Sequence, residues 1–245
     1  AIAPFNEYYA IDDLKQLGIK FTGTAQVPQD VLLVNDTNYL EAYSNNFKKG
    51  SFFLNGYFED YTYYFDYLEK IRSWFPIQET RDNNDLVVHM RTGDRLFMKN
   101  EFYTKPRATN YLRAINKFEF EKLHIVTDMP DWRYITEGDL KKIKFHADVA
   151  KDKRVPLTES VRYFNEIVEA LSSYKPIVQK RTVLEDFNYI RSFKNILFEH
   201  GTLSWWAAVL SDAEKIGVYG PWRAWKGKSN KNLSNIPINS WFKWE

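Results

Sequence analysis

Polar groups that can bind a substrate follow three short apolar runs of this 245-residue chain. They are His89, Arg91 and Asp94 after the first run, Asp128 after the second, and Gly201, Thr202 and Ser204 after the third. An arginine offers a planar fork of donors that fits a phosphate or carboxylate, and a histidine can transfer a proton. The backbone N–H groups at the start of a helix attract anions. Together these groups are suited to hold a diphosphate.

These groups can meet only if the three apolar runs are strands of one sheet. The first run, Leu86–Met90, is rich in β-branched residues and uninterrupted, which is typical of a strand buried on both faces. We expect strands at 86–90, 123–128, 195–199 and 216–219, with helices at 109–118, 160–173 and 182–191. The alternation predicts βαβ units and a parallel sheet. In such a sheet, ligands bind beyond the carboxyl ends of the strands.

Each of these features also has a purely structural interpretation. Arg91 and Asp94 can form an ion pair that closes a strand. The third group can simply cap a helix, with Thr202 or Ser204 as the cap. Asp128 can cap a helix of its own or contact a ribose or sugar hydroxyl. If the arginine and the helix start lie on one edge of a sheet, the two features together indicate a diphosphate clamp more strongly than either feature does alone.

The composition argues against several other classes of protein. There are 34 Lys and Arg residues against 32 Asp and Glu residues, and this balance gives no support for nucleic-acid binding, although 222–228 interleaves basic and aromatic residues. The chain has no cysteine for a disulfide or a thiolate metal site. It shows no HExxH or P-loop motif and no apolar run of about 18 residues that would span a bilayer. We expect a cytoplasmic protein, or a soluble domain of a larger one, with no metal site and no transmembrane segment.

Five blocks of the chain resemble one family of enzymes. His89-Met90-Arg91-Thr92-Gly93-Asp94 resembles the HxRxGD motif of the α1,2-fucosyltransferases, which are related to the α1,6- and protein O-fucosyltransferases. Four further blocks resemble segments of that family and occur in the same order along residues 52–222. They are Gly56-Tyr57-Phe58-Glu59, Phe102-Tyr103 with Ala114-Ile115, Thr127-Asp128 with Trp132 (similar to the FSDD…W segment of the family), and Gly201-Thr202-Leu203-Ser204-Trp205-Trp206-Ala207-Ala208-Val209-Leu210.

The resemblance implies an α/β fold of the GT-B type and an inverting, metal-independent glycosyltransferase. Such a fucosyltransferase moves a deoxyhexose from a nucleotide diphosphate sugar, GDP-fucose first, to a hydroxyl of a glycan acceptor. An acceptor-side domain would cover 1–80, a Rossmann-like donor domain 86–215, and a tail packing back across them 216–245. The implied catalytic residues are His89, Arg91 and Asp94. The implied donor-binding residues are Arg91, Asp128, Asp186, Gly201, Thr202 and Ser204, although Asp186 by its position is more often a surface helix residue.

Departures from the family pattern leave two further hypotheses open. The glycine-rich GGLGNQ-type loop with which the family begins is not in the sequence, which favours a non-catalytic module that binds nucleotide sugars or glycans. Glu59 replaces the glutamine of the GYFQ segment, and Thr92 replaces the second arginine of HxRRGD. Another nucleotide-activated sugar, such as a rhamnose donor, is therefore an alternative to GDP-fucose.

Overall fold

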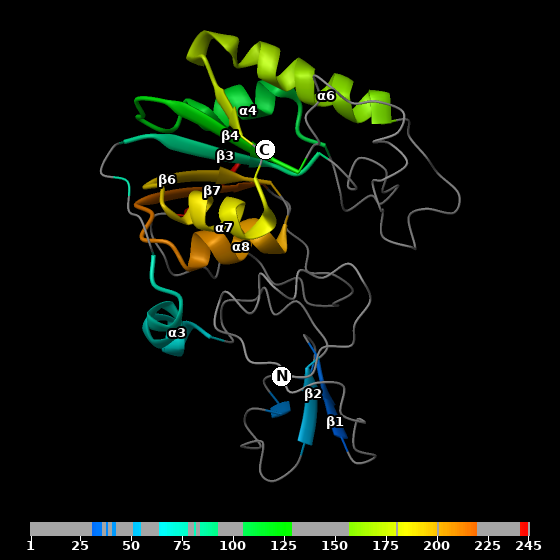
Figure 1. Cartoon of the computed structure of the whole chain (residues 1–245), viewed down its shortest axis with the longest axis vertical. Coiled ribbons are helices and arrows are strands. Elements are labelled where there is room, and N and C mark those ends of the chain that lie inside the picture. Colours follow the sequence, from blue (N-terminus) through cyan, green and yellow to red (C-terminus); the bar gives the residue numbers. More distant parts are fainter. Residues whose placement is uncertain are drawn as a thin grey trace. The chain divides into compact units, whose positions relative to one another are not determined.

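The computed structural model describes the segments of the chain that Figure 1 draws as ribbon. These are residues 31–35, 38, 41–42, 51–54, 64–77, 81, 84–92, 105–128, 157–179, 181–199, 201–219 and 241–244. The chain falls into two compact units, the first made of Ala1–Pro76 with Ala224–Lys231 and the second of Ile77–Arg223 with Asn232–Glu245. The predicted site residues belong to the second unit.

Two strands and a helix are described in the first unit. Strand β1 (Val31–Val34) pairs in parallel with β2 (Ser51–Leu54). A short 3-10 turn, η2 (Phe65–Tyr67), leads into helix α3 (Leu68–Trp74). Leu68 is the buried residue of this helix, so α3 packs through its first turn.

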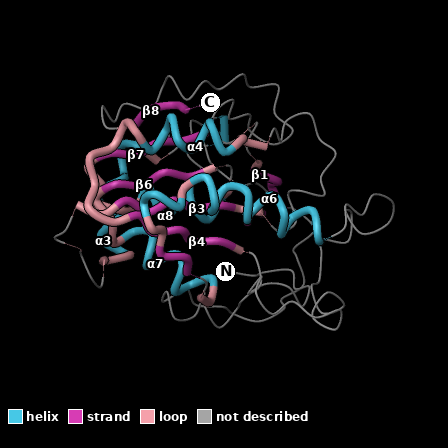
Figure 2. Tube along the Cα trace, turned by 90° about the horizontal axis from the view of Figure 1, so that it is seen from above, coloured by secondary structure: helices cyan, strands magenta, loops and turns pink. Residues whose placement is uncertain are grey.

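A six-stranded parallel sheet forms the centre of the second unit. Its strands are β3 (Leu86–Met90), β4 (Leu123–Thr127), β5 (Ile177–Gln179), β6 (Asn195–Phe198), β7 (Lys215–Tyr219) and β8 (Trp241–Trp244). They lie in the order β5-β4-β3-β6-β7-β8, and each described pairing is parallel. Figure 2 shows β4, β3, β6, β7 and β8 side by side in this order. Counted from β3, it is the 3-2-1-4-5-6 order of a doubly wound sheet.

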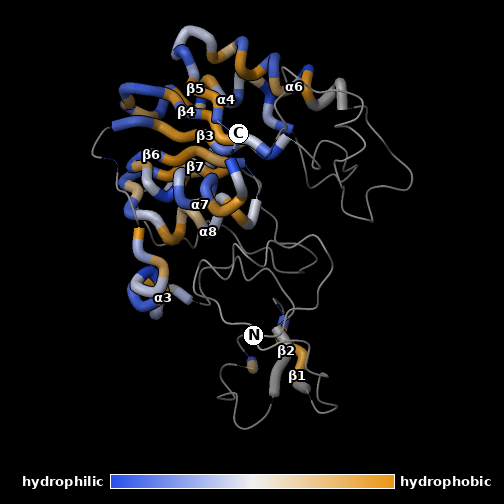
Figure 3. The backbone as a smooth tube through the Cα atoms, viewed as in Figure 1, coloured by the Kyte–Doolittle hydropathy of each residue, from blue (hydrophilic) through white to orange (hydrophobic). Residues whose placement is uncertain are grey.

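Helices cover both faces of the sheet (Figure 1). The helices of one face are α4 (Ala108–Ile115) and α6 (Leu157–Ala170), and those of the other are α7 (Val183–Arg191) and α8 (Thr202–Val209). The central strands are hydrophobic along their length (Figure 3), as expected where both faces of a sheet are buried. None of the helices in the described part of the chain is long and apolar enough to cross a membrane.

Successive residues of β3 point to opposite faces, which divides the core into two layers. Leu86, Val88 and Met90 belong to the apolar cluster beneath α4 and α6, together with Tyr111 and Phe164. His89 points to the opposite face, where its side chain bonds the first turn of α8. A single histidine on a fully buried strand therefore marks the face that carries polar chemistry.

The structure confirms an α/β fold with a parallel sheet. The strands expected at 86–90, 123–128, 195–199 and 216–219 are β3, β4, β6 and β7, with ends within one residue. Strands β5 and β8 were not expected. β5 has three residues and lies at the sheet edge, and β8 lies in the stretch that we expected to be a tail. The predicted domain boundaries remain predictions.

Gly217 leaves no room for a side chain in the middle of β7. A Cβ atom there would lie 2.6 Å from Leu197 Cδ1 and 2.8 Å from Phe242 Cζ. We expect Gly217→Ala to lower the free energy of unfolding by about 1–3 kcal/mol, the usual range for overpacking a core. Urea denaturation measures this change. Unchanged stability would contradict the packing of β6 and β8 against β7, because alanine otherwise suits a strand better than glycine.

Candidate functional site

The candidate site lies where the strand order reverses. From β3 the chain passes to β4 on one side, whereas from β6 it passes to β7 on the other, so that α4 and α8 lie on opposite faces of the sheet. Ligands of doubly wound sheets bind outside the carboxyl ends of the two strands at this reversal. Here those two strands are β3 and β6, which carry His89 and Arg91 on one side and Gly201 on the other.

His89 joins β3 to the start of α8. Its Nδ1 atom forms a hydrogen bond with Ser204 Oγ, and the two side chains are 4% and 0% exposed. The backbone N–H of Glu199 donates to the His89 carbonyl at 3.5 Å. Side-chain and backbone bonds thus connect the same two segments across the strand-order reversal. They fix the first turn of α8 against the end of β3.

Helix α8 begins at a glycine and not at a capping hydroxyl. Gly201 is the N-cap residue, and because it has no side chain it makes no side-chain cap bond. The expectation that Thr202 or Ser204 would be the cap was wrong, because the Ser204 hydroxyl bonds His89 instead. The first intrahelical bond runs from the Trp205 N–H to the Gly201 carbonyl at 2.9 Å. The N–H groups of the first turn precede this bond and have no carbonyl within the helix to bind.

The Arg91 side chain lies beside this glycine. A Cβ atom placed on Gly201 would be 3.8 Å from Arg91 Cδ, 4.0 Å from Arg91 Nη1 and 3.4 Å from Ser204 Oγ. The Arg91 side chain is 33% exposed, so the guanidinium is partly open to solvent. The structure thereby brings a cation and the positive end of a helix dipole to one point. This arrangement can bind an anion.

Asp128 holds the turn that carries Arg91. Its Oδ1 atom accepts a hydrogen bond from the Thr92 N–H at 2.8 Å, and its Oδ2 atom is 4.0 Å from Arg91 Nε. The hydroxyls of Thr92 and Thr127 are 3.1 Å apart and also join the ends of β3 and β4. Asp128 therefore faces the arginine. The pairing of Arg91 with Asp94 stays a prediction, because Asp94 lies outside the described residues.

The predicted site residues have different outcomes. Five of them lie together in the described contacts: His89, Arg91, Asp128, Gly201 and Ser204. Thr202 is half-buried at the start of α8. Asp186 lies in the first turn of α7 and is buried, not on the surface, and the contacts above do not involve it. Asp94 lies outside the described residues. A role for Thr92 was not predicted, although this residue lies inside the block that resembles the HxRxGD motif.

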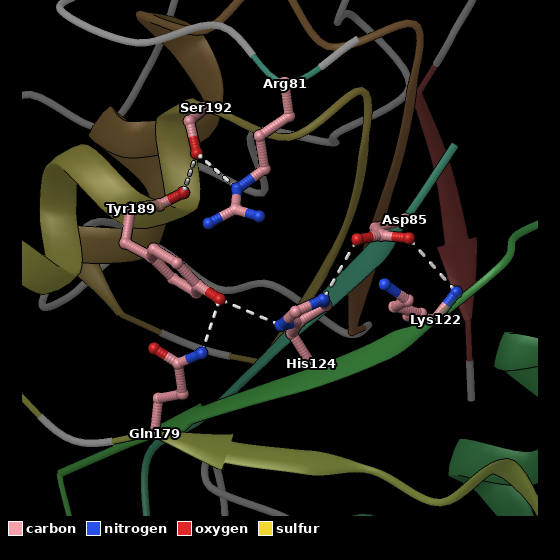
Figure 4. A network of polar contacts seen from close by, with 7 residues as sticks. All are labelled: Arg81, Asp85, Lys122, His124, Gln179, Tyr189 and Ser192. Carbon is pink, nitrogen blue, oxygen red and sulfur yellow. Dashed lines mark hydrogen bonds and ion pairs between the residues drawn. The ribbon is translucent and has the colours of Figure 1, made fainter. Parts of the chain in front are cut away.

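A second polar cluster lies between α7 and the strands β4 and β5 (Figure 4). Gln179 Nε2 donates to the Tyr189 hydroxyl at 2.6 Å, and that hydroxyl bonds His124 Nδ1 at 2.8 Å. His124 Nε2 is 3.1 Å from Asp85 Oδ2. Because an amide nitrogen only donates, the Tyr189 proton is directed to His124. A neutral His124 then carries its proton on Nε2 and donates it to Asp85.

The surroundings of His124 favour its neutral form. Burial lowers the pKa of His124 below its ordinary value of 6.5, and the positive charges of Arg81 and Lys122 lower it further. The hydrogen bond and the charge of Asp85 raise it, but not enough to reverse the direction. No residue spacing in the sequence indicates this cluster, because its members come from distant segments of the chain.

Three comparisons with known proteins gave no match. No family model matches the chain, and neither the curated proteins nor the solved structures contain a match. Within the part of the chain that the structure describes, no three His, Asp or Glu side chains are grouped so that they could hold a metal ion. The geometry at the ends of β3 and β6 therefore carries the functional argument, together with the sequence blocks.

Ser204→Ala should destabilise the fold through His89. The substitution leaves the buried Nδ1 atom of His89 without its hydroxyl partner, which typically costs about 1–3 kcal/mol of unfolding free energy. Urea denaturation measures the loss, with the exposed Ser173→Ala variant as the matched control. A loss no larger than that of the control would show that the bond between β3 and α8 contributes little.

The stability of the fold should fall as the pH drops through the range of histidine titration. The pKa of His124 is lowered in the folded state, so between that value and about 6.5 the unfolded chain binds more protons. In this window the free energy of unfolding therefore rises with pH and decreases on acidification.

His124→Gln should reduce this dependence and keep the other three of the four histidines as an internal control. The measurement is urea denaturation of both proteins at several pH values from 5 to 7.5. Identical slopes of unfolding free energy against pH would contradict the assignment to His124.

Proposed function

We propose that the chain is an inverting glycosyltransferase that uses a nucleotide diphosphate sugar, with GDP-fucose as the first choice, and a glycan hydroxyl as acceptor. The observation that carries the proposal is the position of Arg91 beside Gly201, where the start of α8 meets the end of β3. A guanidinium and a helix N-terminus that converge on one point form a suitable clamp for a diphosphate.

Arg91 would act on the leaving group. As the bond between the sugar and the diphosphate breaks, negative charge develops on the phosphate oxygens. Donors held in advance at that point stabilise this charge without having to reorganise, which is often a large contribution to catalysis. Asp128 Oδ1 holds the Thr92 N–H and Oδ2 faces Arg91 Nε, so the arginine is oriented before the donor binds.

His89 would act through α8 in this proposal. Its side chain is 4% exposed and bonded to Ser204, which places it beneath the first turn of the helix and not beside a ligand. Ser204 is likewise turned inward, so the proposed phosphate donors of α8 are the backbone N–H groups of its first turn. His89 and Ser204 are then positioning residues for those groups.

The sugar and the reaction type come from the resemblance of the sequence blocks. Five blocks in family order favour a fucosyltransferase of GT-B architecture that works without a metal. In that scheme the donor binds the sheet of the second unit and the acceptor binds residues 1–80. A strand order of 3-2-1-4-5-6 suits nucleotide binding in general, so the sheet supports the donor half of the proposal.

Replacing Arg91 by alanine should strongly weaken donor binding. The loss of charged hydrogen bonds to a diphosphate costs about 1.5–3 kcal/mol, or about 10- to 100-fold in affinity. A ligand that binds only the folded state raises the melting temperature. We expect GDP and GDP-fucose to raise it for the native protein without added metal, and not for Arg91→Ala. Arg91→Lys should restore little, because lysine cannot form the bidentate fork.

The exposed Arg113→Ala variant on α4 is the control and should respond as the native protein does. If uridine or thymidine diphosphates raised the melting temperature in place of GDP, the diphosphate clamp would still be supported, but the donor would carry a different nucleotide. Binding of GDP-fucose with neither transfer nor hydrolysis would support the non-catalytic module. An equal shift in the native protein and Arg91→Ala would remove Arg91 from the donor site.

A further inference from the structure

Two arginines contact the ring of one tyrosine, away from the candidate donor site. The Arg81 Cζ atom is 4.6 Å from the centre of the Tyr189 ring and also 4.6 Å from that of Phe193. The Arg181 Cζ atom is 3.8 Å from the centre of the Tyr189 ring. The two guanidinium carbons are therefore no further apart than the sum of their distances to the Tyr189 ring, about 8 Å.

The described carboxylates near these two arginines bond to other groups. Within the described residues, no carboxylate forms an ion pair with Arg81 or Arg181. Asp85 is engaged by His124 and by the Lys122 N–H. Glu185 accepts hydrogen bonds from the Thr182 N–H and hydroxyl at 2.9 and 2.8 Å, and these bonds, helped by the charge of Arg181, lower its pKa. Two positive charges within about 8 Å of each other repel, and a bound anion would reduce this repulsion.

Among the described residues, most hydrogen-bond donors of the two guanidinium groups have no partner. A guanidinium stacked on a ring keeps its N–H groups in its own plane, pointing away from the ring. Within the described part of the chain the Arg81 side chain donates through Nε, to Ser192 Oγ at 3.3 Å, and Figure 4 draws no bond from its two terminal nitrogens. The Arg181 side chain is exposed. Both forks can therefore reach a ligand from solvent.

The platform beneath the arginines is rigid. Tyr189 is 8% exposed, and its hydroxyl is fixed by Gln179 and His124. The backbone N–H of Arg81 donates to the Ser192 carbonyl at 3.0 Å, so the arginine is held at both its backbone and its Nε atom. Donors that are fixed before binding lose less conformational entropy when they bind a ligand.

We propose that Arg81 and Arg181, held around Tyr189, bind the phosphate dianion of free phosphate or of a phosphorylated small molecule. Two guanidinium groups match the charge of a phosphate dianion and offer it two forks of donors. This site shares no residue with the Arg91 clamp, so it does not depend on the proposed glycosyltransferase activity.

The test is isothermal titration calorimetry with inorganic phosphate and with a hexose 6-phosphate, at constant ionic strength. The protein carries Arg91→Ala, so that phosphate binding at the donor site does not contribute. We expect saturable binding that weakens at least tenfold in Arg81→Gln and in Arg181→Gln. It should stay within twofold in Arg113→Gln, which removes an exposed charge from α4. Tighter binding of the hexose phosphate would identify a phosphorylated metabolite, and equal binding would identify the phosphate group alone.

Melting temperatures establish whether the variants are folded. If Arg81→Gln loses the fold, Arg181→Gln decides the outcome, because its exposed side chain adds little to the core. The proposal is overturned by binding that is unchanged in Arg181→Gln, or by the absence of binding in the Arg91→Ala protein. Phosphate binding that disappears with Arg91→Ala alone would belong to the donor site and would therefore test the proposed function instead.

Discussion

The parallel pairing of β3 with β6 is the constraint on which the candidate site depends. These two strands are neighbours in the sheet, with Leu86 beside Asn195 and His89 beside Phe198. The chain leaves them toward opposite edges and opposite faces of the sheet. His89, Arg91 and Gly201 meet at the ends of these strands for that reason. Without this register, the arginine and the helix start would be separate features of separate strands.

Local sequence patterns were sufficient to predict most strands of the sheet and part of the candidate site. Uninterrupted apolar runs predicted β3, β4, β6 and β7, because strands buried on both faces need apolar residues at each position. The rule that parallel strands end at one edge then placed His89, Arg91 and Gly201 together. Strand β5 escaped prediction because an edge strand of three residues, with Ile177 41% exposed, has no buried run to detect.

The remaining contacts depend on register and on tertiary partners. Asp128 reaches the Thr92 N–H because Met90 lies beside Thr127, and a single sequence does not specify that register. Serine is a preferred helix cap, but the Ser204 hydroxyl forms a hydrogen bond with the buried His89 instead. The cluster around His124 joins residues 39 and 65 positions away, with no periodicity that could connect them.

The order of the strands also determines which segment stays unpaired while the chain is being synthesised. β3 is synthesised first of the six, yet it occupies the centre, and its partner β6 follows more than a hundred residues later. At about 5–20 residues per second, that interval lasts about 5–20 seconds. Throughout it, one edge of Leu86–Met90 has no β6 to pair with, and this segment has the apolar, uncharged character of sequences that pair with other chains. The nascent protein therefore passes through a stage in which its future centre is an open edge, and a chaperone that covers apolar segments would act on it there.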